Sequence, residues 1–196
     1  MALPTYNKAN RRVTFEQLPK AAYVVKILGA KKENGNYGPQ VSITFDIAEG
    51  KYAGFYQAQF DRNSNEDKKW PYDAVFYLNI PNDSSPEYVW RNWNTFFADL
   101  EDSNSGFVFD GDLKKLKGKL IGGKFHIKQT KGNNGTIYDH TRMKFSCVAE
   151  DVRQGKAGRL PNDKPIEGAP AATTGSASAI DGFLSIPEGA EDELPF

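Results

Sequence analysis

One short segment of strict alternation constrains the fold more than any other part of the chain. Between residues 41 and 47, apolar side chains alternate with Ser, Thr and Asp, so every second side chain would face a core. This period of two is typical of a strand in an antiparallel sheet with one buried face. A weaker alternation at 20–29 precedes it, and the Asn, Gly and Pro residues within 31–40 predict the loop between two strands. The segment 52–61 is interpreted as the third strand of a meander.

A helix is predicted after this meander. Ser85 is suited to an N-cap, Pro86 to the first helical position, and Glu87 to the positive end of the helix dipole. The apolar residues that follow fall on one helical face: Val89, Trp93, Phe96, Phe97 and Leu100. An amphipathic helix that ends between residues 102 and 106 is therefore expected.

Two further strands are predicted at the end of the folded part of the chain. They cover 119–129 and 136–149, and the Gly- and Asn-rich residues 131–135 are predicted as their hairpin loop. The aromatic segment 70–80 and a basic turn at 113–117 are expected as additions around this plan. Three strands, a helix and two strands indicate a mainly β, small antiparallel domain with one helix. The same element order occurs in OB-folds, which are partly open five-stranded barrels.

The formal net charge of zero conceals two regions of opposite charge. Residues 1–160 carry a net charge of +6, whereas 161–196 carry −6. A basic body indicates an anionic partner, and an acidic arm could compete for the same surface. The arm begins with a stretch rich in Pro, Gly, Ala, Thr and Ser, which has too little apolar surface to offset the entropy of ordering it. We expect a folded domain over 1–158 and a disordered acidic tail over 159–196, so that deletion from Pro161 leaves the body folded.

Basic and aromatic side chains are interleaved on the predicted second hairpin. Alternation places Lys124, His126 and Lys128 on one face of its first strand, and the polar face of its second strand has the same character. A binder of single strands that ignores base sequence needs positive charge for the phosphates and aromatic rings for base stacking. The candidate nucleic-acid-binding residues are Lys31, Lys32, Tyr37, Tyr52, Tyr56, Lys124, His126, Lys128, Tyr138, Arg142 and Lys144.

The remaining aromatic residues divide between surface and core. Tyr77, in the segment 70–80, is a further stacking candidate. The aromatic residues expected in the core are Phe45, Phe60, Trp93, Phe125 and Phe145. The alternative interpretation of the basic strand faces is a solvated surface that binds no ligand, since most charged side chains are simply exposed.

Signals for catalysis are weak throughout the chain. His126, His140 and Cys147 lack the spacing of metal ligands, and neither a phosphate-binding loop nor a nucleophile elbow is present. No catalytic residue, metal site or cofactor is therefore expected. A single cysteine excludes a disulfide within the chain and favours a reducing, cytoplasmic setting. Neither a signal peptide nor a run long enough to cross a membrane is recognised in the sequence.

Two parts of the chain resemble known single-stranded DNA-binding proteins. The final residues are similar to the C-terminal tip of the bacterial proteins, with Asp192, Glu193, Leu194, Pro195 and Phe196 at the acidic, hydrophobic and Pro-Phe positions. The segments 22–27, 38–47 and 51–54 resemble, more loosely, the small single-stranded DNA-binding proteins of bacteriophages from Gram-positive hosts. The resemblance implies an OB-fold-like five-stranded antiparallel barrel with one helix between strands 3 and 4.

The resemblance also implies a function and a set of partners. The expected function is to coat and protect single-stranded DNA, and to recruit replication, recombination and repair proteins through the C-terminal tip in the cytoplasm of a bacterial host. A homo-oligomer is compatible with the sequence, and no membrane partner is expected. Two alternatives remain open at this point: a β-domain that assembles with other proteins and uses its arm only as a linker, and a nuclease or other DNA-processing enzyme on the same scaffold.

Overall fold

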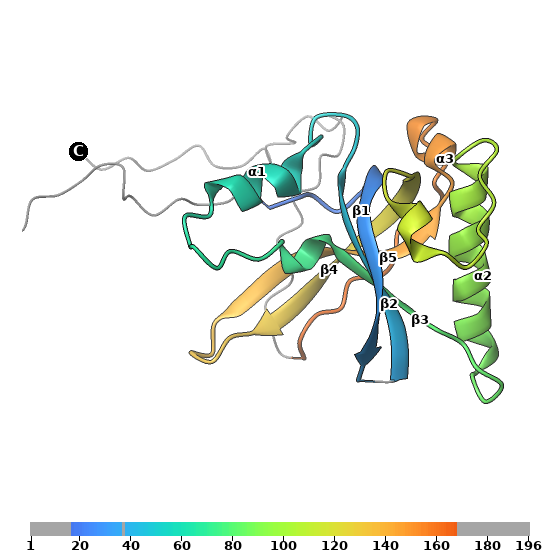
Figure 1. Cartoon of the computed structure of the whole chain (residues 1–196). Helices are drawn as coiled ribbons and strands as arrows, with labels where there is room; N and C mark the ends of the chain where they lie inside the picture. Colours follow the sequence, from blue (N-terminus) through green and yellow to red (C-terminus); the bar gives the residue numbers. More distant parts are fainter. Residues whose placement is uncertain (1–16, 37, 168–196) are drawn as a thin grey trace, which may run out of the picture.

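The computed structural model describes residues 17–36 and 38–167 (Figure 1). Its centre is a five-stranded antiparallel sheet with the strand order β3-β2-β1-β4-β5. The strands are β1 (Ala22–Gly35), β2 (Gly38–Ile47), β3 (Val75–Asn79), β4 (Leu120–Lys131) and β5 (Ile137–Cys147). The helices are α1 (Phe55–Arg62), α2 (Glu87–Asp102) and α3 (Ala149–Arg153), with 3-10 turns η2 (Tyr72–Ala74) and η3 (Leu113–Leu116). None of the described helices is long and apolar enough to cross a membrane.

The sheet curls so that its two edge strands approach each other. β1 is the central strand: it pairs with β2 along most of its length and with β4 only over residues 22–26. The register of β1 against β2 shifts between Ile27 and Gly29, and such a bulge increases the local twist. At the open seam, the Arg142 Nη2 of β5 donates to the Val75 carbonyl at the start of β3, at 3.4 Å. The result is a mainly β fold compatible with an OB-like barrel.

The interior is filled by every second side chain of the strands, as the alternation of 41–47 predicts. Phe45 and Phe125 meet edge to face with ring centroids 5.9 Å apart. The helix α2 packs across β3, β4 and β5 (Figure 1). Of its predicted apolar face, Val89, Phe96, Phe97 and Leu100 are buried and Trp93 is half-buried. Its Phe96 stacks on Phe76 of β3 at a centroid distance of 5.7 Å. The helix begins one residue later than predicted, with Pro86 at the N-cap.

The predicted third strand is wrong, because residues 52–61 form a turn followed by α1. Gly50 and Gly54 adopt positive φ angles of 79° and 72°, which turn the chain out of the sheet after β2. The Asp46 carboxylate then accepts hydrogen bonds from the Tyr56 and Gln57 backbone N–H groups at 2.9 and 3.1 Å, in the first turn of the helix. The third strand is β3 instead, within the segment that was expected to be an addition.

The chain beyond α3 returns to the sheet before it leaves the described region. The Lys164 N–H donates to the Ile127 carbonyl at 2.8 Å, and the Gln129 N–H donates to the Lys164 carbonyl at 3.0 Å. The Asp163 carboxylate accepts from the Ile127 N–H at 2.9 Å and pairs with Lys20, also at 2.9 Å. We call residues 159–167 the strap. Residues 162–164 and 166 of the predicted tail are thus hydrogen-bonded to β4.

Candidate nucleic-acid interface

A groove of about 280 Å³ lies between β3 and β5, on the outer side of the open seam. Four cationic side chains line it, together with a ring from β3. The cations are Lys128, Arg142, Lys144 and Lys164, and the ring is that of Tyr77. Three different parts of the chain supply the positive charge: β4, β5 and the strap.

Strand pairing explains why these cations gather on one face. His126 lies opposite Arg142, and Lys128 lies opposite His140, in the antiparallel register of β4 and β5. Directly opposite residues of an antiparallel pair project from the same face. The same rule applies to Lys31 of β1, Ser42 of β2 and Tyr77 of β3, which are register partners and so project from one face of the sheet. The predicted polar face of the second hairpin is therefore the face that borders the groove.

Arg142 connects the two walls of the groove. Its guanidinium lies 4.1 Å from the centre of the Tyr72 ring, and its Nη1 donates to the Tyr72 hydroxyl at 3.0 Å. Its Nε is 3.9 Å from Asp73 Oδ1, and its Nη2 reaches the Val75 carbonyl. Tyr72 remains 57% exposed, so its ring is available to a ligand while the guanidinium holds its position. The Tyr72 and Tyr77 ring centroids are 6.4 Å apart, which makes a pair of neighbouring aromatic surfaces.

The two histidines differ in electrostatic character. His140 Nδ1 lies 3.0 Å from Asp73 Oδ2, and this hydrogen bond to a carboxylate raises the pKa of His140. Its Nε2 lies 2.9 Å from the Thr130 hydroxyl. His126 is buried, and burial lowers its pKa, while its Nδ1 donates to the Asn162 carbonyl of the strap at 3.2 Å. His126 therefore supports the strap as a neutral ring rather than supplying charge to the groove.

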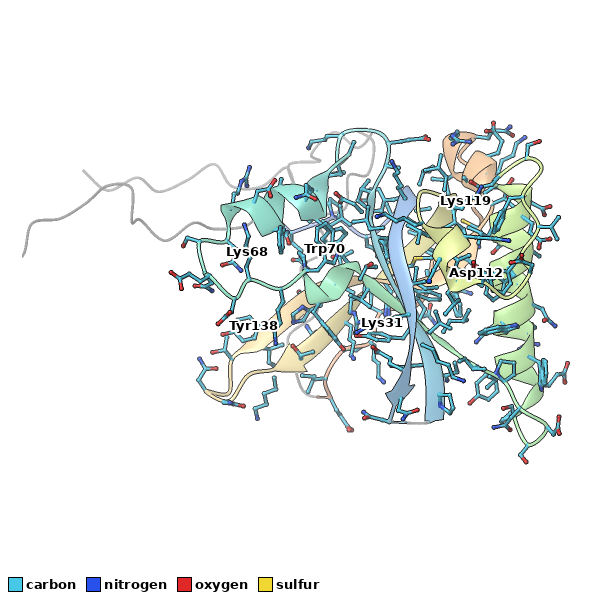
Figure 2. The ribbon with its side chains drawn as sticks, in the orientation of Figure 1. Lys31, Lys68, Trp70, Asp112, Lys119 and Tyr138 are labelled. Carbon is cyan, nitrogen blue, oxygen red and sulfur yellow. The ribbon has the colours of Figure 1, made fainter. Side chains whose placement is uncertain are left out.

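The predicted site residues divide into those that border the groove and those that lie elsewhere. His126, Lys128, Arg142 and Lys144 line it. Figure 2 shows Lys31 beside the β1–β2 hairpin and Tyr138 beside the β4–β5 hairpin, and both residues are exposed. Lys32 is also exposed, but its register partner is the buried Val41, so it projects from the other face of β1. Tyr37 and the tip residues Asp192, Glu193, Leu194, Pro195 and Phe196 lie outside the described residues.

Three further predicted site residues, besides Lys31, Lys32 and Tyr138, do not line the groove. Tyr56 is only 2% exposed and packs edge to face against Phe45, so it offers no free ring face for a base. Tyr52 packs against Tyr23 and Phe55 near the start of α1, a position that follows from the corrected secondary structure there. Lys124 pairs with Phe145 where β4 also meets β1, and its Nζ lies near Gly158 rather than in the groove.

The structure adds residues that the sequence did not indicate. Tyr72 and Asp73 belong to η2, which leads directly into β3, and both contact Arg142, a residue that lines the groove. An aromatic cluster at 70–77 was visible in the sequence, but its position beside Arg142 depends on the curl of the sheet. Lys164 falls in the predicted tail, and no pattern in the sequence indicated the strap.

Phe145 was expected in the core, and it is 44% exposed. The register of β4 against β5 shifts between Lys124 and Phe125, so Lys124 pairs with Phe145 whereas Phe125 pairs with Met143. Lys144 is the extra residue of this bulge. Because of the extra residue, the side chains that follow it in β5 face the opposite side from the one that strict alternation predicts. Met143 stays buried, but Lys144 and Phe145 are both exposed. A parity argument fails at a bulge because the period of two is interrupted there.

The part of the chain that the structure describes does not meet the requirements of a three-ligand metal site or of a reactive cysteine. Among residues 17–36 and 38–167, no group of three His, Cys, Asp or Glu side chains could hold a metal ion. Burial raises the pKa of Cys147 to about 11, so the thiol stays protonated near neutral pH. No protein-family model matches the chain, and no curated protein is significantly similar to it. The function is therefore inferred from the geometry of the groove.

Proposed function

We propose that the protein binds single-stranded DNA in the groove between β3 and β5, without strong preference for base sequence. The observation that carries this proposal is the conjunction of four cationic side chains and the half-buried Tyr77 ring in the groove with the neighbouring exposed ring of Tyr72, on an OB-like sheet. Phosphates would be neutralised by the lysines, with release of counterions, and bases would stack on the rings. In this proposal the protein coats and protects single strands in a bacterial cytoplasm and is not an enzyme.

The arrangement of charges and rings is better suited to binding a polymer than to binding a compact anion. The lysines come from separate elements along the groove, whereas a single phosphate group would need convergent donors. Tyr72 and Tyr77 are side by side, so successive bases of one strand could use both rings. Every base has an aromatic face, and stacking therefore gives affinity with little base preference.

A titration of labelled oligo-dT tests the proposal directly. Tyr72→Ala is expected to weaken binding by about 1–3 kcal/mol, because a stacking surface is lost. Tyr72→Phe is the matched control: it keeps the ring, removes only the hydroxyl that accepts from Arg142, and should retain most of the affinity. A wild-type protein that does not bind oligo-dT would overturn the proposal. Equal binding by Tyr72→Ala would remove this ring from the DNA site.

The acidic tip extends the proposal to protein partners. In the recruitment role, the Phe196 ring would enter an apolar pocket on a replication, recombination or repair protein, while Asp192 and Glu193 would steer the approach to a basic surface. Phe196→Ala is expected to abolish capture of such proteins in a pull-down and to leave oligo-dT binding unchanged. Phe183→Ala, which removes another ring of the same tail, is the matched control. If Phe196→Ala retains the partners, the recruitment role is wrong and the DNA-binding role is unaffected.

A further inference from the structure

We propose that the bound strand continues from the groove to a second base-binding site between β5 and α2, formed by Phe145 and Tyr88. This inference rests on the proposed DNA-binding function and adds a site that lies outside the barrel groove. The ligand is an unpaired nucleobase of the strand that already occupies the groove. The site would extend the length of DNA that each protein molecule covers.

The first observation is the exposure of two rings that face one hollow. Phe145 is 44% exposed and Tyr88, near the start of α2, is 54% exposed. Both line a hollow of about 120 Å³ between β3, α2 and β5. Large exposed aromatic side chains are costly to leave in water, and two of them at one hollow mark a binding surface. The bulge in β5 produces this arrangement, because it turns Phe145 out of the core.

The second observation is continuity with the groove. Phe76, Tyr77 and Lys144 line both the groove and the hollow, so the two form one connected surface. Tyr77 lines both, and the centroid of the Tyr72 ring is 6.4 Å from that of Tyr77. A strand that stacks on Tyr72 and Tyr77 would therefore be directed toward Phe145 and Tyr88. The path crosses β5 at the bulge.

The third observation is the chemistry of the hollow. Lys144 is the bulge residue next to Phe145, and its Nζ lies 5.9 Å from the centre of that ring. It would neutralise the phosphate that connects the junction base to the next one. Asn92 and Thr95 of α2 present polar side chains to the hollow and could bond the edge of any base. Rings, one cation and neutral polar groups match a nucleotide of any sequence better than an apolar peptide side chain.

The test is a comparison of oligo-dT lengths with the full chain. In a series of about 4–16 nucleotides, Phe145→Leu is expected to weaken binding of the longer oligonucleotides by about 5- to 150-fold. Binding of the shortest oligonucleotide that still binds should be unchanged, because it occupies only the groove. Leucine keeps an apolar side chain and removes the ring, whereas Phe145→Tyr should restore wild-type binding. Trp90→Ala is the matched control, since Trp90 is an exposed ring of the same helix that does not line the hollow.

Photocrosslinking gives a second readout that does not depend on affinity. An oligonucleotide with bromodeoxyuridine at the end that reaches the hollow should crosslink to the peptide that contains Phe145 or Tyr88. Wild-type binding of every length by Phe145→Leu would overturn the second site and leave the groove proposal standing. An equal loss at every length would also overturn it, because Phe145 would then belong to the groove itself. Loss of protein capture with intact DNA binding would reassign the hollow to a protein partner, and no binding of any oligonucleotide by the wild type would overturn both proposals.

Discussion

Replacement of Lys128, Lys144 and Lys164 by glutamine is expected to remove most of the affinity for oligo-dT. Each side chain lines the groove, and removing each charge-assisted hydrogen bond to a phosphate should cost about 1 kcal/mol or more. The triple variant should then bind on the order of a hundredfold more weakly at low salt. The dependence on salt should also fall, by about 0.7 in logarithmic slope for each phosphate that is no longer neutralised. Titrations with labelled oligo-dT at several salt concentrations measure both quantities.

The matched control removes the same charge from elsewhere on the body. Lys114, Lys117 and Lys156 are exposed, and none of them lines the groove. Glutamine at these three positions should change affinity much less than the groove variant. A similar loss of affinity in both variants would show that net charge, rather than the groove, governs binding. Arg142 is left intact in this comparison because it also joins β5 to Tyr72 and Val75, so its removal would disturb the seam.

The second large effect concerns stability and distinguishes two truncations of the acidic arm. A chain cut after Glu167 keeps the strap and should unfold at the same denaturant concentration as the full chain. A chain cut after Leu160 loses five hydrogen bonds to His126, Ile127 and Gln129 of β4, and the ion pair between Asp163 and Lys20. At about 1 kcal/mol for each hydrogen bond, the free energy of unfolding should fall by about 5 kcal/mol. Urea denaturation followed by tryptophan fluorescence measures the difference.

This result would revise the truncation that the sequence suggests. Deletion from Pro161 was expected to leave the body folded, but it removes most of the strap together with the acidic arm. The cut after Glu167 keeps the strap and removes residues 168–196, which include five acidic side chains. It is therefore the correct variant for testing whether the arm competes with DNA. Equal stability of the two truncations would mean that the strap hydrogen bonds contribute nothing to the fold.

The sequence predicted most of the strands and the main helix because their patterns are local. The alternation at 41–47 and the turn residues at 131–135 encode hairpins without reference to the rest of the chain. The error at 52–61 has a physical cause: Tyr52, Phe55 and Tyr56 fit a helical spacing as well as a strand in so short a segment. The Asp46 carboxylate, which binds the first turn of α1, could be assigned only in three dimensions.

The candidate site was predictable where it followed from strand parity and not where it followed from tertiary contacts. Lys128 and Arg142 were placed on one face by alternation, and the register of β4 and β5 agrees with that placement. Tyr72 contacts Arg142 only because β3 approaches β5, and Lys164 lines the groove only because the strap returns to β4. A bulge has no clear signature in a single sequence, so the outward position of Phe145 could not be foreseen.

The seam between β3 and β5 gives the groove a mechanical property that the rest of the barrel lacks. The neighbouring strands of the sheet are joined by ladders of backbone hydrogen bonds, whereas the described contacts across the seam run through the side chains of Arg142, His140 and Asp73. Side-chain links can lengthen or rotate at less cost than a ladder can slip, so opening at the seam should have a smaller free energy than opening elsewhere in the sheet. We therefore expect the groove to change its width at a lower free-energy cost than unfolding of the sheet would require. In the proposed complex with DNA, a groove of adjustable width would accommodate purines and pyrimidines at similar energetic cost. It would also accept different backbone conformations of a flexible strand.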